Sequence, residues 1–205
     1  MKNYYSAFWL SLLCIAVFIV QLSISGFTDA LVLNQSSWIQ PWRFISAIFL
    51  HASPEHLIFN LFALLLFGLI LESIIGSKKL ILVFFASGII ANVIAVNFYP
   101  SSLGASGAIY GILGCLTVLR PKMAVWVFNL PMPMFLATIL WVGVAVFGIF
   151  NPSGVGDIAH LSGIAAGGIF GLFYLAQFPA AKKEARKKIW IDERSMRAWE
   201  DQHFS

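Results

Sequence analysis

Charged residues are scarce in this chain. Aspartate, glutamate, lysine and arginine together make up 11% of the 205 residues, whereas 60% are hydrophobic. A soluble globular domain carries about a quarter charged residues and about half apolar residues. A chain of this length cannot bury so much apolar surface within itself, so lipid must cover part of it. The composition therefore predicts a protein that crosses the membrane several times.

Cysteine is also rare, and the chain has only Cys14 and Cys115. Both lie in apolar runs and neither belongs to a C-x-x-C pair, so we expect no disulfide framework and no metal or redox centre built on them. Small apolar packing residues are the expected role. The chain also lacks a sequence repeat and a linker that would mark a second domain.

Six apolar stretches predict the architecture. Most are close to the roughly 20 residues that a membrane-spanning helix needs, and they lack the two-residue alternation of a membrane barrel. The first has no A-x-A-like cleavage site, so we expect a retained helix and not a signal peptide. The expected fold is an all-α membrane protein with six transmembrane helices, over Phe8–Ser25, Glu55–Ile75, Lys79–Phe98, Ala105–Leu119, Pro133–Phe150 and Ile158–Phe178.

The basic residues predict the orientation. With the N-terminus in the cytoplasm and six spans, every lysine and arginine except Arg43 falls on the cytoplasmic side. The positive-inside rule therefore favours six spans with both termini cytoplasmic. We expect residues 1–181 to form the membrane domain and residues 182–205 a basic cytoplasmic tail. The cluster of lysine and arginine in this tail favours attraction to anionic membrane lipids over binding of nucleic acid.

Two external loops carry further predictions. The first, Gly26 to Pro54, is long and rich enough in tryptophan and phenylalanine to lie in the membrane interface. The fourth apolar stretch spans 15 residues, or about 22 Å of helix, against a hydrocarbon core of roughly 30 Å. The loop before it must then dip into the membrane, where irregular backbone is tolerated only inside protein or beside water. We therefore expect a wet external cavity that ends near Ser106.

Four polar residues fall at a similar depth near the external side: His56, Asn60, Ser106 and His160. Polar groups inside a membrane are costly and point to function. Ser53 and Pro54 predict a helix start just before His56, and Asn60 lies on the same helical face as His56, four residues on. Alone, Ser106 and Asn60 have plain packing roles, whereas His160 in a membrane needs a partner. Together, at one depth, they predict a site.

Small residues predict how two of these helices meet. The fourth stretch contains Gly107, Gly111 and Gly114, and the sixth has small residues every four positions from Ala159 to Gly171. Such faces let transmembrane helices approach backbone to backbone. This approach would bring His160 within hydrogen-bond reach of the Ser106 hydroxyl, which is the geometry of a nucleophile and its base.

The motifs resemble those of rhomboid-family intramembrane proteases. Gly104-Ala105-Ser106-Gly107 resembles the G-x-S-G motif of that family, and His56 to Asn60 resembles its H-x-x-x-N motif. The sixth stretch resembles the family's A-H-x-x-G-x-x-x-G, from Ala159 through Gly163 to Gly167. The pair Trp42-Arg43 and the tyrosine Tyr110 also match. The order and spacing agree from Trp42 to Gly171.

The resemblance implies hydrolysis of a peptide bond in a transmembrane substrate near the external membrane face. Ser106 would be the nucleophile and His160 the base, as a dyad without a carboxylate. His56, Asn60 and the Ser106 backbone N–H would form the oxyanion hole. Supporting roles would fall to Tyr110, which stacks on the catalytic histidine, and to Gly104, Gly107 and Gly163.

The resemblance also bears on neighbouring residues. Asp157 is close to His160 in sequence, but its loop position favours a solvated helix cap over a third catalytic role. His51 matches a histidine that the family tends to carry before the second core helix, and we expect it to be supporting. The aromatic pair that gates substrate entry in the family has no clear match.

Three alternatives remain. A non-proteolytic rhomboid-like protein would bind membrane clients, although such relatives lack the serine or the histidine. A metal-dependent protease would need ligands such as His51, His56 and His160, but the chain has no H-E-x-x-H motif. A transporter would need charges near the midplane. The only acidic residue well inside a span is Glu72, which we expect to pair with Lys78 or the fourth loop.

The remaining expectations concern context. We expect no cofactor and no metal, with transmembrane substrates and membrane lipids as partners, and the sequence does not predict an oligomeric state. A short chain without a targeting segment fits a prokaryotic cell membrane.

Overall fold

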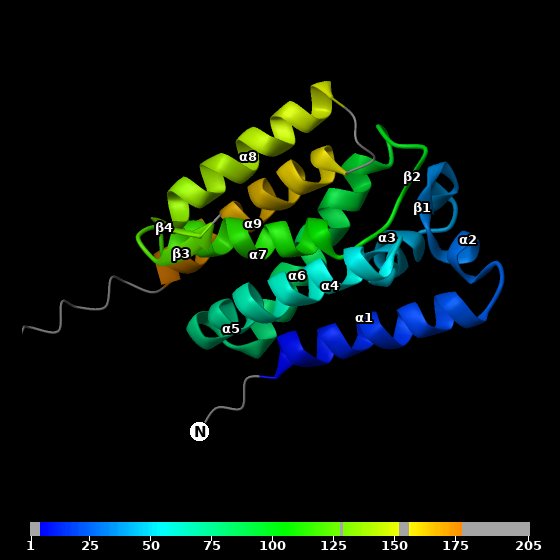
Figure 1. The fold of residues 1–205 in the computed structure, drawn as a ribbon, viewed down its shortest axis with the longest axis horizontal. Helices are drawn as coiled ribbons and strands as arrows, with labels where there is room; N and C mark the ends of the chain where they lie inside the picture. The colour runs from blue at the N-terminus through cyan, green and yellow to red at the C-terminus, as the bar shows by residue number, and fades with distance from the viewer. Residues whose placement is uncertain (1–4, 128, 152–155, 178–205) are drawn as a thin grey trace, which may run out of the picture.

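The computed structural model describes residues 5–127, 129–151 and 156–177, and the predicted tail at 182–205 lies outside these ranges. Figure 1 shows long helices side by side in one bundle, joined by short elements at the two ends. The α-helices are α1 (Ser6–Ser23), α2 (Phe27–Leu31), α3 (Arg43–Ser46), α4 (Pro54–Ala63), α5 (Leu69–Ile75), α6 (Ser77–Ala95), α7 (Ser106–Leu119), α8 (Met134–Phe150) and α9 (Asp157–Gln177).

Each predicted apolar stretch contains a helix, so a mostly helical membrane architecture is confirmed. Four helical segments are long and apolar enough to cross a membrane: α1, the segment Pro54–Ile75, α6 and α9. In the second of these, a π-helical turn, η3 (Leu64–Gly68), joins α4 to α5 without a break. The helices α7 and α8 are apolar but shorter, with 14 and 17 residues. The exact count of six membrane crossings therefore stays a prediction.

The helix α7 forms the centre of the bundle. Ten of its 14 residues are buried, among them Ile112 and Leu116 with no exposed surface. The helix α8 lies at the edge of the bundle in Figure 1 and buries only four of its 17 residues. Its exposed side chains are apolar, as expected for a surface that meets lipid.

The predicted small-residue faces meet between α7 and α9. A Cβ atom added to Gly163 would run into the backbone carbonyl of Gly107, and one added to Gly167 would run into that of Gly111. Gly114 is equally close to the backbone of Ile164. The close approach predicted from the four-residue spacing is therefore confirmed.

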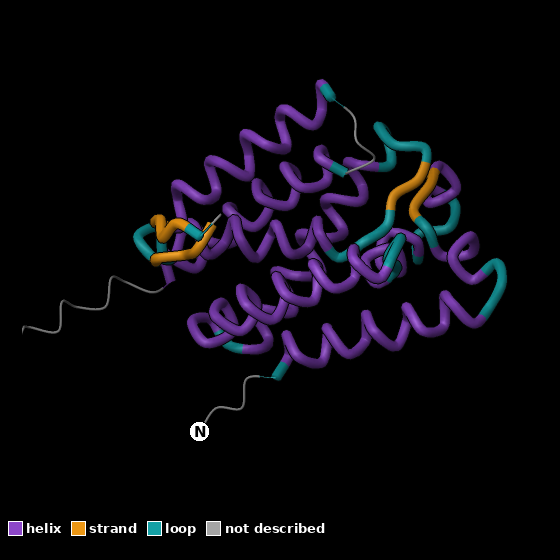
Figure 2. Tube along the Cα trace, in the orientation of Figure 1, coloured by secondary structure: helices purple, strands orange, loops and turns teal. Residues whose placement is uncertain are grey.

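Two antiparallel strand pairs were not predicted. At one end of the bundle, β1 (Leu33–Asn34) pairs with β2 (Ser101–Ser102) and so ties the first loop to the loop before α7. At the other end, β3 (Ala124–Val127) and β4 (Leu130–Pro133) form a hairpin between α7 and α8. The tube in Figure 2 shows both pairs in orange at opposite ends of the helices.

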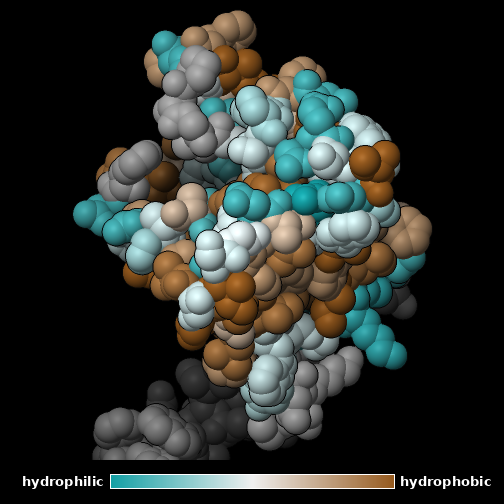
Figure 3. All heavy atoms as spheres, turned by 90° about the vertical axis from the view of Figure 1, so that its right-hand side faces the viewer, coloured by the Kyte–Doolittle hydropathy of each residue, from teal (hydrophilic) through white to brown (hydrophobic). Residues whose placement is uncertain are grey.

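The first loop is a compact structure held by Arg43. This side chain is buried, and its Nη1 donates to the backbone oxygens of Asp29 and Val32 at 2.8 Å each. Two short 3-10 helices, η1 (Gln35–Trp38) and η2 (Ala47–Phe49), lie on either side of α3. Figure 3 faces this end of the molecule and shows hydrophilic side chains gathered across it, with hydrophobic side chains beside them. The interfacial position of the loop stays a prediction.

The expected partner of Glu72 was wrong. Its carboxylate accepts hydrogen bonds from the backbone N–H groups of Ser6 and Ala7 at 2.8 and 3.2 Å, and from the Ser77 hydroxyl at 2.6 Å. The N–H groups in the first turn of a helix have no partner within the helix, and a carboxylate there also benefits from the helix dipole. Glu72 therefore caps α1, while Lys78 is exposed.

Candidate active site

The start of α4 positions two of the predicted site residues. Ser53 is the N-cap, where its hydroxyl accepts the His56 backbone N–H at 3.2 Å, and Pro54 occupies the first turn. One turn later, the Asn60 side chain donates from Nδ2 to the His56 carbonyl at 2.8 Å. His56 and Asn60 thus share one face of α4, as their spacing predicts, and both line the same cavity.

A glycine brings the chain to the start of α7. Gly104 has a φ of 128°, a conformation that side chains strongly disfavour. A Cβ atom there would also lie 2.8 Å from Cε1 of His56. The Gly104 N–H donates to the Ala47 carbonyl at 2.9 Å, which fixes this turn against the first loop. Ser106 follows as the first residue of α7.

His160 meets Ser106 from the facing helix. Its Nε2 lies 2.9 Å from the Ser106 hydroxyl oxygen. Its ring stacks on that of Tyr110, with centroids 4.2 Å apart and an angle of 19° between the planes. Only 8% of His160 is exposed, so the ring is held between α7 and α9. The geometry expected from the glycine faces is present, and Tyr110 lies where the resemblance implied.

A cavity of about 510 Å³ opens above these residues. It lies at the end of α7 where the helix begins, and the loop before α7 supplies part of its lining. Ser106, His160, His56, Asn60, Gly104 and Gly107 all line it, so the structure gathers these predicted residues in one place. Gly163 supports the site from outside the lining through its contact with Gly107.

Several polar lining residues were missed by sequence reasoning. Tyr99, Ser101 and Ser102 come from the loop before α7, and Asn92 comes from α6. The Tyr99 hydroxyl accepts the Ile158 backbone N–H at 3.0 Å at the start of α9. The loop residues could have been identified from the sequence, since the loop predicted to dip into the membrane contains two serines and a tyrosine. For Asn92, the only indication in the sequence was that a polar residue lies inside a predicted span.

His51 lies behind the cavity and is almost fully buried. Its ring centroid is 5.2 Å from that of His56, and its Nδ1 is 3.2 Å from the Phe49 carbonyl oxygen. Burial, together with the positive charge that His56 can carry, lowers the pKa of His51 to about 4. His51 is therefore neutral at physiological pH, in keeping with a supporting role next to His56.

Asp157 is not the solvated cap expected from its sequence position. It is only 6% exposed. Its carboxylate packs against Gly148, where a Cβ atom on α8 would collide with both carboxylate oxygens. The reason is that α8 and α9 pack closely at this end, a contact that the sequence pattern does not show. Asp157 thus belongs to the packing between α8 and α9.

The arrangement can perform nucleophilic chemistry. With Nε2 of His160 accepting the Ser106 hydroxyl proton, the serine oxygen becomes a nucleophile at the floor of a cavity. Hydrogen-bond donors of His56 and Asn60 line the same cavity. Within the three described ranges, no three histidine, cysteine, aspartate or glutamate side chains come together as a metal site.

Comparison with known proteins finds rhomboid-family matches over most of the chain. A family model for the Rhomboid domain matches residues 39–177. The rhomboid protease GlpG of Haemophilus influenzae is 33% identical over 174 residues, which cover 79% of this chain and 86% of that protein. The rhomboid protease GlpG of Yersinia pseudotuberculosis is 29% identical over 163 residues, and the chain spans 57% of its length. The mitochondrial RHOMBOID-like protein 6 of Arabidopsis thaliana is 29% identical over 149 residues, or 48% of its length.

Proposed function

The chain belongs to the rhomboid family of intramembrane serine proteases, and we propose that it cleaves transmembrane proteins near the external membrane face through a Ser106–His160 dyad. The observation that carries this proposal is the 2.9 Å contact between His160 Nε2 and the Ser106 hydroxyl, at the floor of a cavity. A serine that simply packs in a membrane helix bonds a carbonyl of its own helix, as Ser11 does with Ala7 at 2.8 Å.

Acylation is the first half of the reaction. The Ser106 oxygen attacks the carbonyl carbon of the scissile peptide bond while His160 Nε2 takes the hydroxyl proton. A tetrahedral intermediate with a negative oxygen forms. It collapses when the C–N bond breaks and His160 returns its proton to the leaving amine. Ser106 is left as an ester of the N-terminal product.

Hydrolysis of the ester completes the cycle. Water entering from the cavity loses a proton to His160 and attacks the ester carbonyl. The second tetrahedral intermediate releases the carboxylic acid product and returns the proton to the Ser106 oxygen. Tyr110 keeps the His160 ring in one orientation through both halves by stacking on it.

The oxyanion hole is formed by His56, Asn60 and the Ser106 backbone N–H. Asn60 uses one N–H for the His56 carbonyl, so its second N–H is available to the cavity. The Ala52 backbone N–H points at Nδ1 of His56 at 3.4 Å, which favours the tautomer with its proton on Nε2. Donors fixed in this way stabilise charge as it develops, since little water competes there.

The orientation belongs to the same proposal. With both termini in the cytoplasm, the cavity at the start of α7 opens to the external side, and the β3–β4 hairpin lies on the cytoplasmic side with Arg120 and Lys122. Substrates then present their cleavage site from the external half of the membrane. Residues 182–205 form the basic cytoplasmic tail in this proposal.

Labelling with a fluorophosphonate probe tests the nucleophile directly. We expect the purified wild-type protein to be labelled and Ser106→Ala to remain unlabelled. Ser102→Ala is the matched control, because Ser102 lines the same cavity and has no bond to His160. Equal labelling of all three proteins would contradict the role of Ser106. A wild-type protein that is neither labelled nor active would favour the client-binding alternative.

A further inference from the structure

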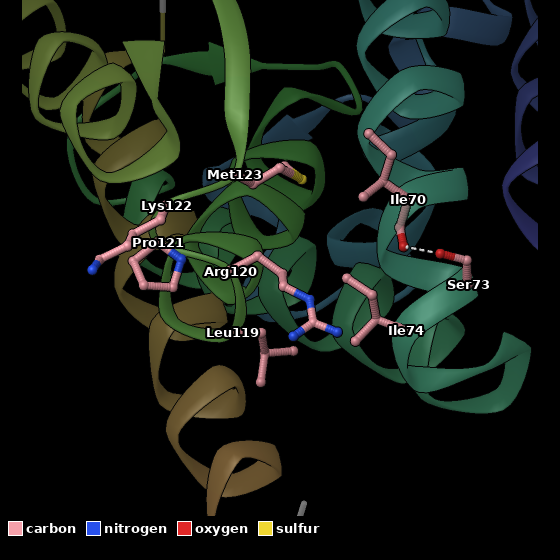
Figure 4. Close-up of a pocket in the computed structure, with 8 residues that line it drawn as sticks. All are labelled: Ile70, Ser73, Ile74, Leu119, Arg120, Pro121, Lys122 and Met123. Carbon is pink, nitrogen blue, oxygen red and sulfur yellow. Dashed lines mark hydrogen bonds between the residues drawn. The ribbon is translucent and has the colours of Figure 1, made fainter. Parts of the chain in front are cut away.

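A second cavity lies at the opposite end of α7. It has a volume of about 540 Å³ and lies between α5 and the turn that follows α7. The 14-residue length of α7 places it about 21 Å from Ser106 along the helix axis. It is therefore separate from the candidate active site. Figure 4 shows its lining, which consists of Ile70, Ser73, Ile74, Leu119, Arg120, Pro121, Lys122 and Met123.

The lining combines cations with apolar walls. Arg120 and Lys122 are both exposed, and neither forms an ion pair or a side-chain hydrogen bond with a residue in the described ranges. Four of the other lining side chains are large and apolar. In Figure 4, Arg120 extends towards Ile74 on α5, whereas Lys122 leaves the turn on the other side. The Arg120 guanidinium thus lies beside the apolar wall.

No carboxylate of α5 neutralises this charge. The acidic residue of α5 is Glu72, and its two oxygens are already bonded to the start of α1 and to Ser77. Ser73 is the only neutral polar side chain in the lining, and its hydroxyl donates to the Ile70 carbonyl at 2.7 Å. The cavity therefore keeps a positive charge for a ligand to balance.

The turn that carries the cations is fixed by backbone hydrogen bonds. The Met123 N–H donates to the Arg120 carbonyl at 3.0 Å, and the Phe135 N–H donates to the Pro121 carbonyl at 3.1 Å. Arg120 itself donates its N–H to Leu116 at 2.7 Å. A turn held at both ends presents its charges in one place, which lowers the entropy cost of binding a ligand there.

We infer that this cavity binds one anionic phospholipid, with the phosphate on Arg120 and an acyl chain along Ile70 and Ile74. A soluble anion would leave the apolar wall unused, and an apolar ligand would leave the cations unpaired. A zwitterionic lipid would bring its own cation next to Arg120 and Lys122. Basic pockets between transmembrane helices recognise anionic headgroups in this way, and the proposed orientation puts the cavity in the cytoplasmic leaflet.

Native mass spectrometry of the detergent-solubilised full chain tests this inference. The protein would be titrated with dioleoylphosphatidylglycerol and, separately, with dioleoylphosphatidylcholine. We expect one phosphatidylglycerol to bind preferentially to the wild type, and Arg120→Gln to weaken that binding about fivefold, the effect of one cation near an anionic headgroup. Lys78→Gln is the matched control, since Lys78 is also exposed at this end but does not line the cavity.

Two further arms test the apolar wall and the acyl chains. Ile74→Trp fills the apolar wall without changing the charge, and we expect it to weaken phosphatidylglycerol binding as well. Glycerophosphoglycerol, the headgroup without acyl chains, should bind far more weakly than the lipid. The inference is overturned if Arg120→Gln and Lys78→Gln weaken binding equally, if phosphatidylcholine binds as tightly, or if the free headgroup does. Absence of lipid binding by the wild type would also overturn it, and would favour another occupant such as acidic residues of the tail at 182–205.

Discussion

At the residue scale, Ser106 and His160, the proposed dyad, lie among neighbours that hold the side chains of the site in place. Tyr110 stacks on the ring of His160, and the absence of a side chain at Gly104 leaves room for the ring of His56. Asn60 is positioned by its bond to the backbone of α4. Each contact restricts a rotamer before substrate arrives, so the site is organised in the free enzyme.

Asn60 is one donor of the proposed oxyanion hole. Asn60→Ala would remove this donor, so we expect kcat to fall roughly 10- to 1,000-fold with little change in KM. Asn97→Ala is the matched control, because Asn97 also donates to the carbonyl four residues before it, at 2.9 Å, but lies outside the cavity. Steady-state kinetics on a peptide reporter would measure both. An equal loss in the two variants would refute the role of Asn60.

A second prediction uses the lowered pKa of His51. The folded protein holds this pKa at about 4, below the ordinary value of about 6.5, so the unfolded chain binds the proton more readily. The free energy of unfolding should be nearly unaffected above about pH 7 and should fall as the pH drops from about 6.5 to 4, by roughly 3 kcal/mol.

The control for this prediction is His51→Asn, which keeps a side-chain donor for the Phe49 carbonyl but cannot titrate. Unfolding in detergent, followed by circular dichroism across that pH range, should show a flatter pH dependence in this variant. His56 is present in both proteins, so its own titration does not separate them. The same slope in both proteins would contradict the assignment to His51.

The candidate site could be predicted from the sequence because its residues lie beside patterns that repeat at helical spacing. Ser106 and His160 flank small-residue faces spaced by four, and His56 and Asn60 lie one turn apart behind an N-cap. The partners of Glu72 and Asp157 could not be predicted in this way. Both depend on which helices are neighbours, α1 for Glu72 and α8 for Asp157. A single sequence does not contain that information.

At the element scale, the pairing of α7 with α9 brings Ser106 and His160, the proposed dyad, within hydrogen-bond distance. The backbones approach so closely that glycine is needed at Gly114, Gly163 and Gly167, where a side chain would run into the backbone of the facing helix. In lipid, such contact supplies packing energy that the hydrophobic effect cannot, because the tails are as apolar as the helices. The site thus depends on the same contact that stabilises the bundle.

Two glycines that are neighbours in α9 give a direct test. Gly167→Ala puts a methyl group into the Gly111 carbonyl, and we expect a loss of about 1–3 kcal/mol in stability together with reduced activity. Gly168→Ala meets nothing within 4 Å and should be neutral or slightly stabilising. Thermal unfolding in detergent would rank the variants. Equal stability of the two would contradict the close contact.

Helix positions were more predictable than strands. Long apolar runs bounded by proline, glycine and charge fix each helix to within a few residues. The β1–β2 pair has only two residues in each strand, too few for any alternation to appear. Burial alternates along Ala124–Val127 in β3, but all four residues are apolar, so the sequence shows no such alternation. Pro131 and Pro133 argue against a strand in β4. Proline is tolerated in an edge strand, and β4 is an edge strand of a two-stranded sheet.

At the scale of the whole molecule, two cavities in the described part of the chain lie at opposite ends of α7. The polar cavity contains the proposed chemistry, and the proposed orientation would place the basic cavity in the other leaflet. The outer surface between them is largely apolar, with α8 among the most exposed helices. In the proposed orientation, the start of α7 faces the exterior.

Thiol labelling tests that orientation. Cys14 and Cys115 are buried, so a single introduced cysteine reports its own location. We expect Ser25→Cys to react with a membrane-impermeant maleimide in intact cells, and Lys78→Cys to react only after permeabilisation. Both positions are exposed, so a difference reflects sidedness. The reverse pattern would invert the proposed topology, and equal labelling of both in intact cells would contradict a single orientation.

Proteolysis by Ser106 is best tested by cleavage of a transmembrane reporter by the purified protein in liposomes with EDTA present, beside Ser106→Ala and Ser102→Ala. We expect cleavage by the wild type and by Ser102→Ala, at a site near the external membrane face, and none by Ser106→Ala. Cleavage by Ser106→Ala at the wild-type rate would contradict the role of Ser106, because another nucleophile would then be performing the reaction.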